Sequence, residues 1–249
     1  MPDFTSESTF QDKADFSPRK SARPIRLAEE TCPMLAENAL SVVTKNSLFR
    51  KMNLFIKRIF DVTASCCALV VLAPTFLVIA GLIRLESPGK AIFVQERWGK
   101  DMKKIRIYKF RSMYIDRCDA SGVVQAVASD TRITRIGNFI RRTNIDELPQ
   151  LINVVKGDLS IVGPRCHPVG MFAGGKLYED LVPEYHIRHL VHPGITGLAQ
   201  SKGLRGPTTD AHMAILRVEN DLRYIADMSV LGDIRIIALT ALNEINRRS

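Results

Sequence analysis

The sequence predicts an α+β fold that is mainly helical, with a re-entrant membrane helix (helix, break, helix) followed by a cytoplasmic domain containing a short β-hairpin. Three observations lead to this fold class: an uncharged apolar stretch broken by a proline, two β-rich runs joined by a turn, and later apolar residues at helical spacing. A hydrophobic fraction of 46% supports a real core and excludes wholesale disorder. A mean hydropathy of only +0.01 argues against several membrane spans.

The chain divides into three predicted regions. Residues 1–50 carry seven basic and seven acidic residues without a long apolar periodicity, so we expect a mostly flexible N-terminal extension with a short helix near Met34 to Val43. Residues 51–90 form the membrane-associated region, and residues 91–249 form the cytoplasmic domain. The whole formal charge of +9 falls after residue 50 and indicates an anionic partner, such as a phosphate, a nucleotide, a nucleic acid or an acidic membrane.

The apolar stretch runs from Val62 to Ile83 and holds 22 residues without a charge, enough for a straight helix to cross a hydrocarbon core of ~30 Å. Pro74 removes a helix hydrogen bond in its middle, so we expect a break at Ala73–Pro74. Basic residues flank both ends: Lys51, Lys57 and Arg58 before it, Arg84 and Lys90 after it. Because positive residues favour the cytoplasmic side, the stretch is predicted to enter and leave on that side. A buried core helix and a kinked full span are the alternatives.

Asp61 directly precedes the apolar stretch and follows Lys57 and Arg58. The helix macrodipole favours a carboxylate at a helix N-terminus. We expect Asp61 to have a structural role, paired with a neighbouring arginine and fixing the angle at which the helix enters the interface.

The cytoplasmic domain begins with two β-rich runs, AIFVQER and KIRIYKF, joined by WGKDM, and this pattern predicts a hairpin. Residues 114–131 are polar and predicted to be a surface loop. Ile136, Phe139 and Ile140 then recur at helical spacing.

The next helix carries the candidate chemistry. With Asn144 as N-cap, Glu147 falls at the capping-box position and Gly157 ends the helix. Asp146 and Glu147 are then expected at the positive end of a helix, which lowers the pKa of a carboxylate and attracts phosphate. Arg141 and Arg142 lie just upstream, within reach of the same place. The simpler alternative is that both acids are only capping residues.

Two later segments add cations and glycines. In GDLSIVGPR a Gly-Pro turn presents Arg165, which suits bidentate phosphate binding. The segment HPGITGLAQSKGLRG contains four glycines, which would let the backbone of this loop lie close to a substrate. An ordinary surface connection is an equal alternative. A zinc site is disfavoured, because no cysteine or carboxylate pairs cleanly with the histidines spaced by three, His186, His189 and His192. The P-loop, Rossmann and GxSxG signatures are missing from the sequence.

Taken together, the motifs resemble the bacterial sugar transferases, the monotopic phosphoglycosyl transferases. The resemblance covers roughly residues 55 to 247 and is carried by KRIFD with the apolar hairpin, FVQERWG, IYKFRSM, RRTNIDELPQLINVVKGDLSIVGPR and HPGITGLAQ. The sequence departs from the family in two places. Ala73 stands where a serine often precedes the proline, and His192 and Leu198 replace a basic or polar residue and a tryptophan of the Gly-rich loop.

The resemblance implies the transfer of a sugar 1-phosphate from a UDP-sugar to undecaprenyl phosphate with release of UMP. We expect the sugar to be a hexose. The resemblance also implies Mg²⁺, a place in the bacterial inner membrane with the catalytic domain facing the cytoplasm, and a role at the start of exopolysaccharide synthesis. No nucleic-acid partner is expected, and a homodimer is one option for the oligomeric state. Two other functions stay open: a basic membrane-anchored adaptor for nucleic acid or lipid, and a glycosyltransferase that releases UDP.

By resemblance, Asp146 attacks the β-phosphate of the donor and forms a covalent phosphosugar intermediate. Glu147 then acts as a base toward the lipid phosphate or as a Mg²⁺ ligand, and both acids are candidate Mg²⁺ ligands. The candidate phosphate and substrate contacts are Arg141, Arg165, Arg111 and Gln200.

Overall fold

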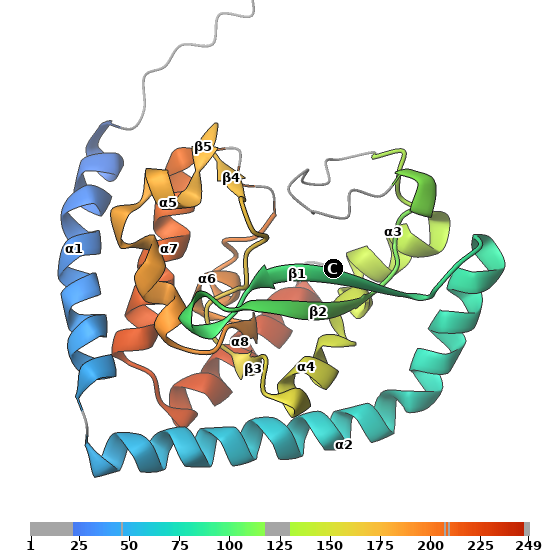
Figure 1. The fold of residues 1–249 in the computed structure, drawn as a ribbon, viewed down its shortest axis with the longest axis horizontal. Coiled ribbons are helices and arrows are strands. Elements are labelled where there is room, and N and C mark those ends of the chain that lie inside the picture. Colours follow the sequence, from blue (N-terminus) through green and yellow to red (C-terminus); the bar gives the residue numbers. More distant parts are fainter. Residues whose placement is uncertain (1–21, 46, 118–129, 207, 209, 247–249) are drawn as a thin grey trace, which may run out of the picture.

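The computed structural model describes residues 22–45, 47–117, 130–206, 208 and 210–246. Two long helices, α1 (Ala22–Thr44) and α2 (Leu48–Glu86), form two sides of a frame around a compact α+β body (Figure 1). The body is mainly helical, and among the described residues the sheets are three separate two-stranded pairs. The predicted mainly helical α+β class is confirmed, and the structure has one long apolar helix and small sheets.

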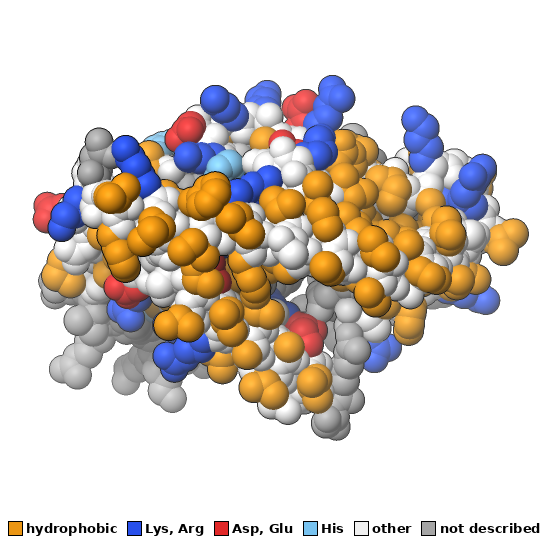
Figure 2. Space-filling model, turned by 90° about the horizontal axis from the view of Figure 1, so that it is seen from below, with side chains coloured by type: hydrophobic (Ala, Val, Ile, Leu, Met, Phe, Trp, Pro, Cys, Tyr) orange, Lys and Arg blue, Asp and Glu red, His pale blue; other side chains and the backbone are white. Residues whose placement is uncertain are grey.

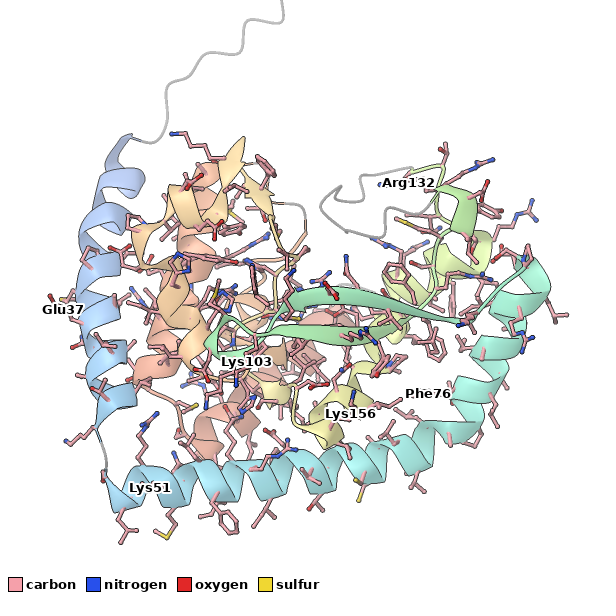
Figure 3. All side chains as sticks on the ribbon, in the orientation of Figure 1. Glu37, Lys51, Phe76, Lys103, Arg132 and Lys156 are labelled. Carbon is pink, nitrogen blue, oxygen red and sulfur yellow. The ribbon has the colours of Figure 1, made fainter. Side chains whose placement is uncertain are left out.

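Helix α1 belongs to the core of the protein. It packs along α7 (Ala211–Ala226), and it buries Cys32, Ala36 and Ala39, which recur at helical spacing on one face. Glu37 points outward from the opposite face (Figure 3). The short helix expected near Met34 to Val43 is therefore part of a longer one that packs on the core. Of the extension predicted at residues 1–50, residues 1–21 and 46 lie outside the described residues.

Helix α2 continues through Pro74 without a change of secondary structure. Its ribbon nevertheless bends in the second half, and Phe76 lies on the inner side of this bend (Figures 1 and 3). A proline inside a helix removes one hydrogen bond and bends the axis, which accounts for the change of direction. The structure therefore shows a bent helix where the sequence predicted two helices separated by a break.

Much of α2 presents apolar side chains to the outside. Figure 2 shows hydrophobic side chains gathered over the underside of the molecule, the face along which α2 runs, with Lys and Arg around its rim. The most exposed of them are Leu48, Phe49, Phe55, Val70, Val71, Leu77, Val78 and Leu85. In the described part of the chain, α2 is the helix long and apolar enough to cross a membrane. The alternative of a buried core helix is wrong, because most of its apolar segment is exposed.

The first half of α2 is held to the body by charged side chains. Lys57 pairs with Asp233 of α8 (Val230–Asn246) and donates to the Val162 carbonyl at 3.1 Å. Arg58 donates to the last carbonyls of α4 (Gln150–Lys156), and Asp61 accepts from Ser160 Oγ at 2.6 Å. The structural role expected of Asp61 fits these contacts. Its charged neighbour is Lys57, at 3.6 Å, instead of an arginine, and it lies within α2 instead of at its start.

The second half of α2 is held by apolar packing. Phe76 meets Phe110 edge to face with ring centroids 5.3 Å apart, and Ile79 and Ile83 pack in the same buried cluster as Ile140. At the end of α2, the carboxylate of Glu86 accepts the first two backbone N–H groups of α3 (Arg135–Arg142), at 2.7 and 3.0 Å. Both ends of α2 are thus fastened to the same body.

The predicted hairpin is present. Strands β1 (Ile92–Trp98) and β2 (Lys104–Phe110) pair antiparallel, with Gln95 opposite Ile107. Asn153 of α4 accepts from the Tyr108 N–H at 3.0 Å and donates to the Arg106 carbonyl at 2.7 Å, which ties α4 to the edge of β2. The loop expected at 114–131 includes a 3₁₀ turn at Ile115–Arg117, and its residues 118–129 lie outside the described residues.

The remaining elements are short. Strand β3 (Ser160–Val162) pairs parallel with β6 (Gly194–Thr196), and β4 (Phe172–Ala173) pairs antiparallel with β5 (Lys176–Leu177). The other helices and 3₁₀ turns are α5 (Tyr178–Leu181), α6 (Leu198–Ser201), η1 (Lys100–Met102), η3 (Ile145–Glu147) and η4 (Pro183–Leu190). The largest core cluster joins α1, α7, η4 and α8.

Candidate active site

The two candidate acids lie on the 3₁₀ turn η3, between α3 and α4. Asn144 adopts the left-handed conformation (φ 56°, ψ 15°) and makes no side-chain cap, so the predicted capping box is wrong. A left-handed Asn is typical of the residue after a helix end, and Asn144 follows the C-cap of α3. Its side chain instead donates to Glu244 Oε2 at 2.7 Å. Gly157, at φ 92°, does end α4 as predicted.

A cavity of about 640 Å³ opens beside η3. Its walls come from the hairpin, α3, η3, the turn at Arg165, η4, α6, α7 and α8. Nine Lys or Arg side chains and four carboxylates line it, so its formal charge is strongly positive. A positively charged pocket of this size fits a phosphorylated ligand.

Glu147 is clamped by two cations. Arg165 Nη1 donates to Oε2 at 3.0 Å, Arg165 Nη2 donates to Oε1, and Lys109 Nζ also donates to Oε1, at 2.7 Å. Burial opposes ionisation of this carboxyl, but the two cations outweigh burial and hold the pKa of Glu147 well below its ordinary value. Glu147 is therefore a fixed anion between two fixed cations.

Asp146, unlike Glu147, has no cation from the described residues bonded to its carboxylate. The residue is 8% exposed, and it makes no hydrogen bond or ion pair with any residue that the structure describes. Burial, together with the charge of Glu147, raises the pKa of Asp146 to about 6. An unpaired carboxylate that lines a cationic cavity is free to bond to a ligand, which a capping acid is not.

The structure brings three of the predicted residues together with Asp146: Glu147, Arg141 and Arg165 all line the cavity. Arg141 reaches Ser112 Oγ at 3.4 Å, a weak contact that leaves the guanidinium available. Arg142 is exposed and is not among the cavity-lining residues.

The other two predicted contacts have different surroundings. Arg111 is 5% exposed and donates to the carbonyls of Pro88 at 2.5 Å and Ser87 at 2.7 Å, just beyond the end of α2. It borders the cavity, but its terminal nitrogens are engaged in holding this end of α2. Gln200 donates to the Ile195 carbonyl at 3.2 Å, whereas its Oε1 is buried in the cavity wall without a partner among the described residues. Gln200 is therefore the better candidate for a substrate contact.

Some glycines of the two later segments allow close backbone packing. A Cβ placed on Gly194 would lie 2.1 Å from the Gly163 nitrogen, so glycine at this position lets the turn before Arg165 approach β6. Gly206, by contrast, has open space where a Cβ would lie, has a φ of 88° and lines the cavity, so backbone contact with a substrate stays a prediction for this end of the loop. His192 and Leu198, the residues that depart from the expected family pattern, are not among the cavity-lining residues.

Lys109 and Arg97 are functional candidates that the sequence analysis missed. Lys109 lies on the same strand face as Ile105 and Ile107. A charged residue on an otherwise apolar face was the pattern in the sequence that could have identified it. Arg97 donates to Gln95 Oε1 at 2.9 Å and to the Cys166 carbonyl at 2.7 Å in the same cavity.

The acid pair also provides oxygen ligands of the kind that Mg²⁺ prefers. Mg²⁺ usually takes one or two carboxylates and completes its shell with substrate phosphates and water. The unpaired oxygens of Asp146 fit this donor set. Within the described residues, no group of three or more His, Cys, Asp or Glu side chains converges as a self-sufficient metal site.

Comparisons with known proteins show the family of this chain. The model of the bacterial sugar transferase family matches residues 52–247. An exopolysaccharide production protein from Rhizobium leguminosarum bv. phaseoli is 57% identical over 196 residues, 79% of this chain and 98% of the relative. A UDP-glucose:undecaprenyl-phosphate glucose-1-phosphate transferase from Escherichia coli is 46% identical over 189 residues, 76% of this chain but only 40% of the relative. A UDP-N-acetylgalactosamine-undecaprenyl-phosphate N-acetylgalactosaminephosphotransferase from Aeromonas hydrophila is 39% identical over 206 residues, 83% of this chain and 46% of the relative. The chain belongs to the bacterial sugar transferase family.

Proposed function

We propose that this protein transfers a sugar 1-phosphate from a UDP-sugar to undecaprenyl phosphate, releases UMP, and so starts the synthesis of an exopolysaccharide. The observation that carries the proposal is the pair of adjacent carboxylates in the cationic cavity, one clamped and one unpaired. The cavity accepts the anionic donor, and the unpaired carboxylate supplies a nucleophile.

The reaction divides into two displacements at one phosphorus atom. In the first, an oxygen of Asp146 bonds to the β-phosphorus of the donor, the bond to the bridging oxygen breaks, and UMP leaves with that electron pair. In the second, an oxygen of the lipid phosphate bonds to the same phosphorus and the Asp146 carboxylate departs, which yields the lipid diphosphate sugar. A pKa of about 6 leaves Asp146 ionised at neutral pH, as a nucleophile requires.

Glu147 has two expected roles, as a base or as a ligand of the divalent cation. Its low pKa makes it a poor proton acceptor, and Arg165 and Lys109 occupy most of its oxygen lone pairs. We therefore favour a role in which Glu147 positions Arg165 and Lys109 at the phosphates and offers its remaining lone pair to the cation. With Asp146, it would hold Mg²⁺, which supplies neutralisation of the diphosphate charge.

We infer the membrane arrangement from how α2 is fastened. Lys57 near its start and Glu86 at its end both bond to the body of the protein. A helix that crossed a hydrocarbon core of ~30 Å would place these two residues on opposite sides. The fastening supports a re-entrant α2 that dips into the inner leaflet and keeps the catalytic domain on the cytoplasmic side, with the exposed apolar side chains in contact with lipid.

For the donor we propose UDP-glucose. Five relatives whose names specify glucose are 42 to 46% identical to this chain over 184 to 193 residues. Of two relatives named for N-acetylgalactosamine, the one from Aeromonas hydrophila is 39% identical over 206 residues, and the one from Bacillus subtilis is 54% identical over a shorter stretch of 112 residues.

The direct test uses purified protein in detergent with UDP-glucose, undecaprenyl phosphate and Mg²⁺. The proposal expects UMP and undecaprenyl diphosphate glucose in equal amounts. Release of UDP would identify a glycosyltransferase instead. No nucleotide release with any UDP-sugar, together with binding of anionic vesicles or nucleic acid, would identify an adaptor.

A further inference from the structure

A second cluster of cations lies in the same cavity, away from the acid pair. Arg188 of η4 and Arg217 of α7 both line the cavity, and they are 2% and 9% exposed. Asp221, one turn beyond Arg217 on α7, is the carboxylate that faces Arg188. The mechanism proposed above uses none of these three residues.

The nitrogen atoms of the two guanidinium groups are only partly used. Arg188 Nε and Nη2 donate to Asp221 Oδ2 at 3.0 and 2.6 Å, and Nη2 also donates to the Arg165 carbonyl at 2.7 Å. Arg217 Nη1 donates to Thr208 Oγ1. Arg188 Nη1, Arg217 Nε and Arg217 Nη2 are buried and have no partner among the described residues. Unsatisfied buried donors are rare in folded proteins and call for an explanation.

The charge of the cluster is also unbalanced. Arg188 forms an ion pair with Asp221, whereas Arg217 has no ion-pair partner among the described residues, so one positive charge is left over. His167 borders the same part of the cavity, and burial together with the charge of Arg188 holds its pKa well below the ordinary value, so this ring is neutral. A buried cation without a partner is costly, and a bound anion with several acceptor oxygens removes that cost.

We propose that Arg188 and Arg217 form a second phosphate-binding subsite, which holds the phosphate that is not transferred. The cluster is one residue away from the reacting centre, because Arg188 bonds to the backbone of Arg165, whose side chain clamps Glu147. Because both groups line one cavity, we assign the β-phosphate of the donor to Asp146 and its α-phosphate to the subsite. The phosphate of the acceptor lipid has the same chemistry and is the other possible source. The inference rests on the proposed function for the identity of these two phosphates.

The test compares Arg217→Gln with two other variants. Gln keeps a donor for Thr208 but removes the charge and the unpartnered nitrogens, whereas Arg217→Lys restores the charge. Arg223→Gln, on the same helix, is the matched control, because Arg223 is exposed and pairs with Glu219 outside the cavity. The melting temperature of each variant is measured first, and a Gln variant that does not fold is replaced by the Lys variant.

Calorimetry with UMP and with uridine measures whether the subsite recognises phosphate. We expect Arg217→Gln to weaken UMP binding by about tenfold or more and to leave uridine binding unchanged, as the loss of charge-assisted hydrogen bonds predicts. Arg217→Lys should recover part of the loss, and Arg223→Gln should bind UMP like the wild type. Kinetics then identify the source: a raised KM for the UDP-sugar alone assigns the subsite to the donor, and a raised KM for undecaprenyl phosphate alone assigns it to the acceptor.

The proposal is overturned if a folded Arg217→Gln protein, or the Arg217→Lys protein where the Gln variant does not fold, keeps the wild-type affinity for UMP and both wild-type KM values. It is also overturned if UMP and uridine lose affinity equally. The outcome does not depend on turnover. If wild-type protein releases no UMP from any UDP-sugar but binds UMP through Arg217, the proposed function fails and the subsite stands. If turnover is observed but neither UMP binding nor either KM value depends on Arg217, only the subsite fails.

Discussion

The carboxylate of Glu147 and the guanidinium of Arg165 face each other as a bidentate pair, with Nη1 and Oε2 3.0 Å apart. The adjacent carboxylate of Asp146 is left without such a partner among the described residues. The pKa of Glu147 is thus held well below its ordinary value, while that of Asp146 is raised to about 6. Neighbouring acids whose pKa values are driven apart are typical of sites in which the two groups have different tasks.

Breaking the clamp should destabilise the protein. In Glu147→Gln, Lys109 and Arg165 face each other without their shared anion, and we expect a loss of about 1–3 kcal/mol in the free energy of unfolding. The loss arises from cations left unpaired. The double variant Glu147→Gln/Lys109→Met should therefore lose less free energy of unfolding than the sum of the losses in the two single variants. Denaturant unfolding of the four proteins in this cycle measures the coupling. Strict additivity would show that the clamp contributes nothing.

The carboxyl of Asp146 should reduce stability at neutral pH. Its pKa is raised to about 6 in the folded protein from an unfolded value of 3.8, so the folded state favours the protonated form. The stability contributed by the protonated carboxyl is complete below the unfolded pKa and is lost as the pH rises through the folded pKa. Asp146→Asn should therefore be more stable than wild type at pH 8, by at most about 3 kcal/mol, and equal to it near pH 3.5. Thermal unfolding of both proteins at the two pH values checks this prediction. A stability difference between Asp146→Asn and wild type that does not change with pH would contradict it.

The fastening of α2 depends on Lys57. Lys57→Met leaves Asp233 buried without its cation, and we expect a loss of about 3–5 kcal/mol in the free energy of unfolding. Asp233→Asn in the same background should recover part of it. Lys51→Met, on the exposed side of the same helix, is the control and should change little. The free energy of unfolding is measured on detergent-solubilised protein. Equal losses in Lys57→Met and Lys51→Met would refute a specific role for Lys57.

The bend at Pro74 should set the membrane topology. Single cysteines at the exposed positions Lys51 and Lys90, in a protein whose exposed Cys66 and Cys67 are replaced by alanine, should both resist a membrane-impermeant reagent added to the periplasmic side. Pro74→Leu restores a helix hydrogen bond and straightens α2, so a fraction should cross the membrane and become labelled at one end. Periplasmic labelling of one end in the protein that keeps Pro74 would show that α2 spans the membrane.

The parts of the fold that obey a local rule were predictable. The hairpin follows from alternation in β1 and β2, and Gly157 ends α4 because glycine adopts the left-handed conformation without strain. The apolar stretch was found from its length and lack of charge. The resemblance supplied the roles of Asp146 and Glu147, and the structure places both at the cavity.

The parts that depend on distant residues were not predictable in the same way. Thr143-Asn144 fits either the start of one helix or the end of the one before, and the left-handed Asn144, bonded to Glu244, ends α3. Helix α1 has small buried residues such as Ala36 and Ala39, which give a weak apolar signal until α7 is known to lie against them. The sequence analysis did not single out Arg188 and Arg217, because their burial is set by η4 and α7 packing together.

The central claim is that Asp146 is the nucleophile, and trapping the intermediate tests it most directly. Wild-type protein is mixed with UDP-glucose and Mg²⁺ without the acceptor lipid, quenched, and analysed by mass spectrometry of the peptide that contains Asp146. We predict a glucose phosphate adduct on Asp146, one UMP released per adduct, loss of the adduct when undecaprenyl phosphate is added, and no adduct in Asp146→Asn. The absence of any adduct in an active wild-type preparation, with UMP appearing only when the acceptor is present, would contradict the account and assign Asp146 to cation binding alone.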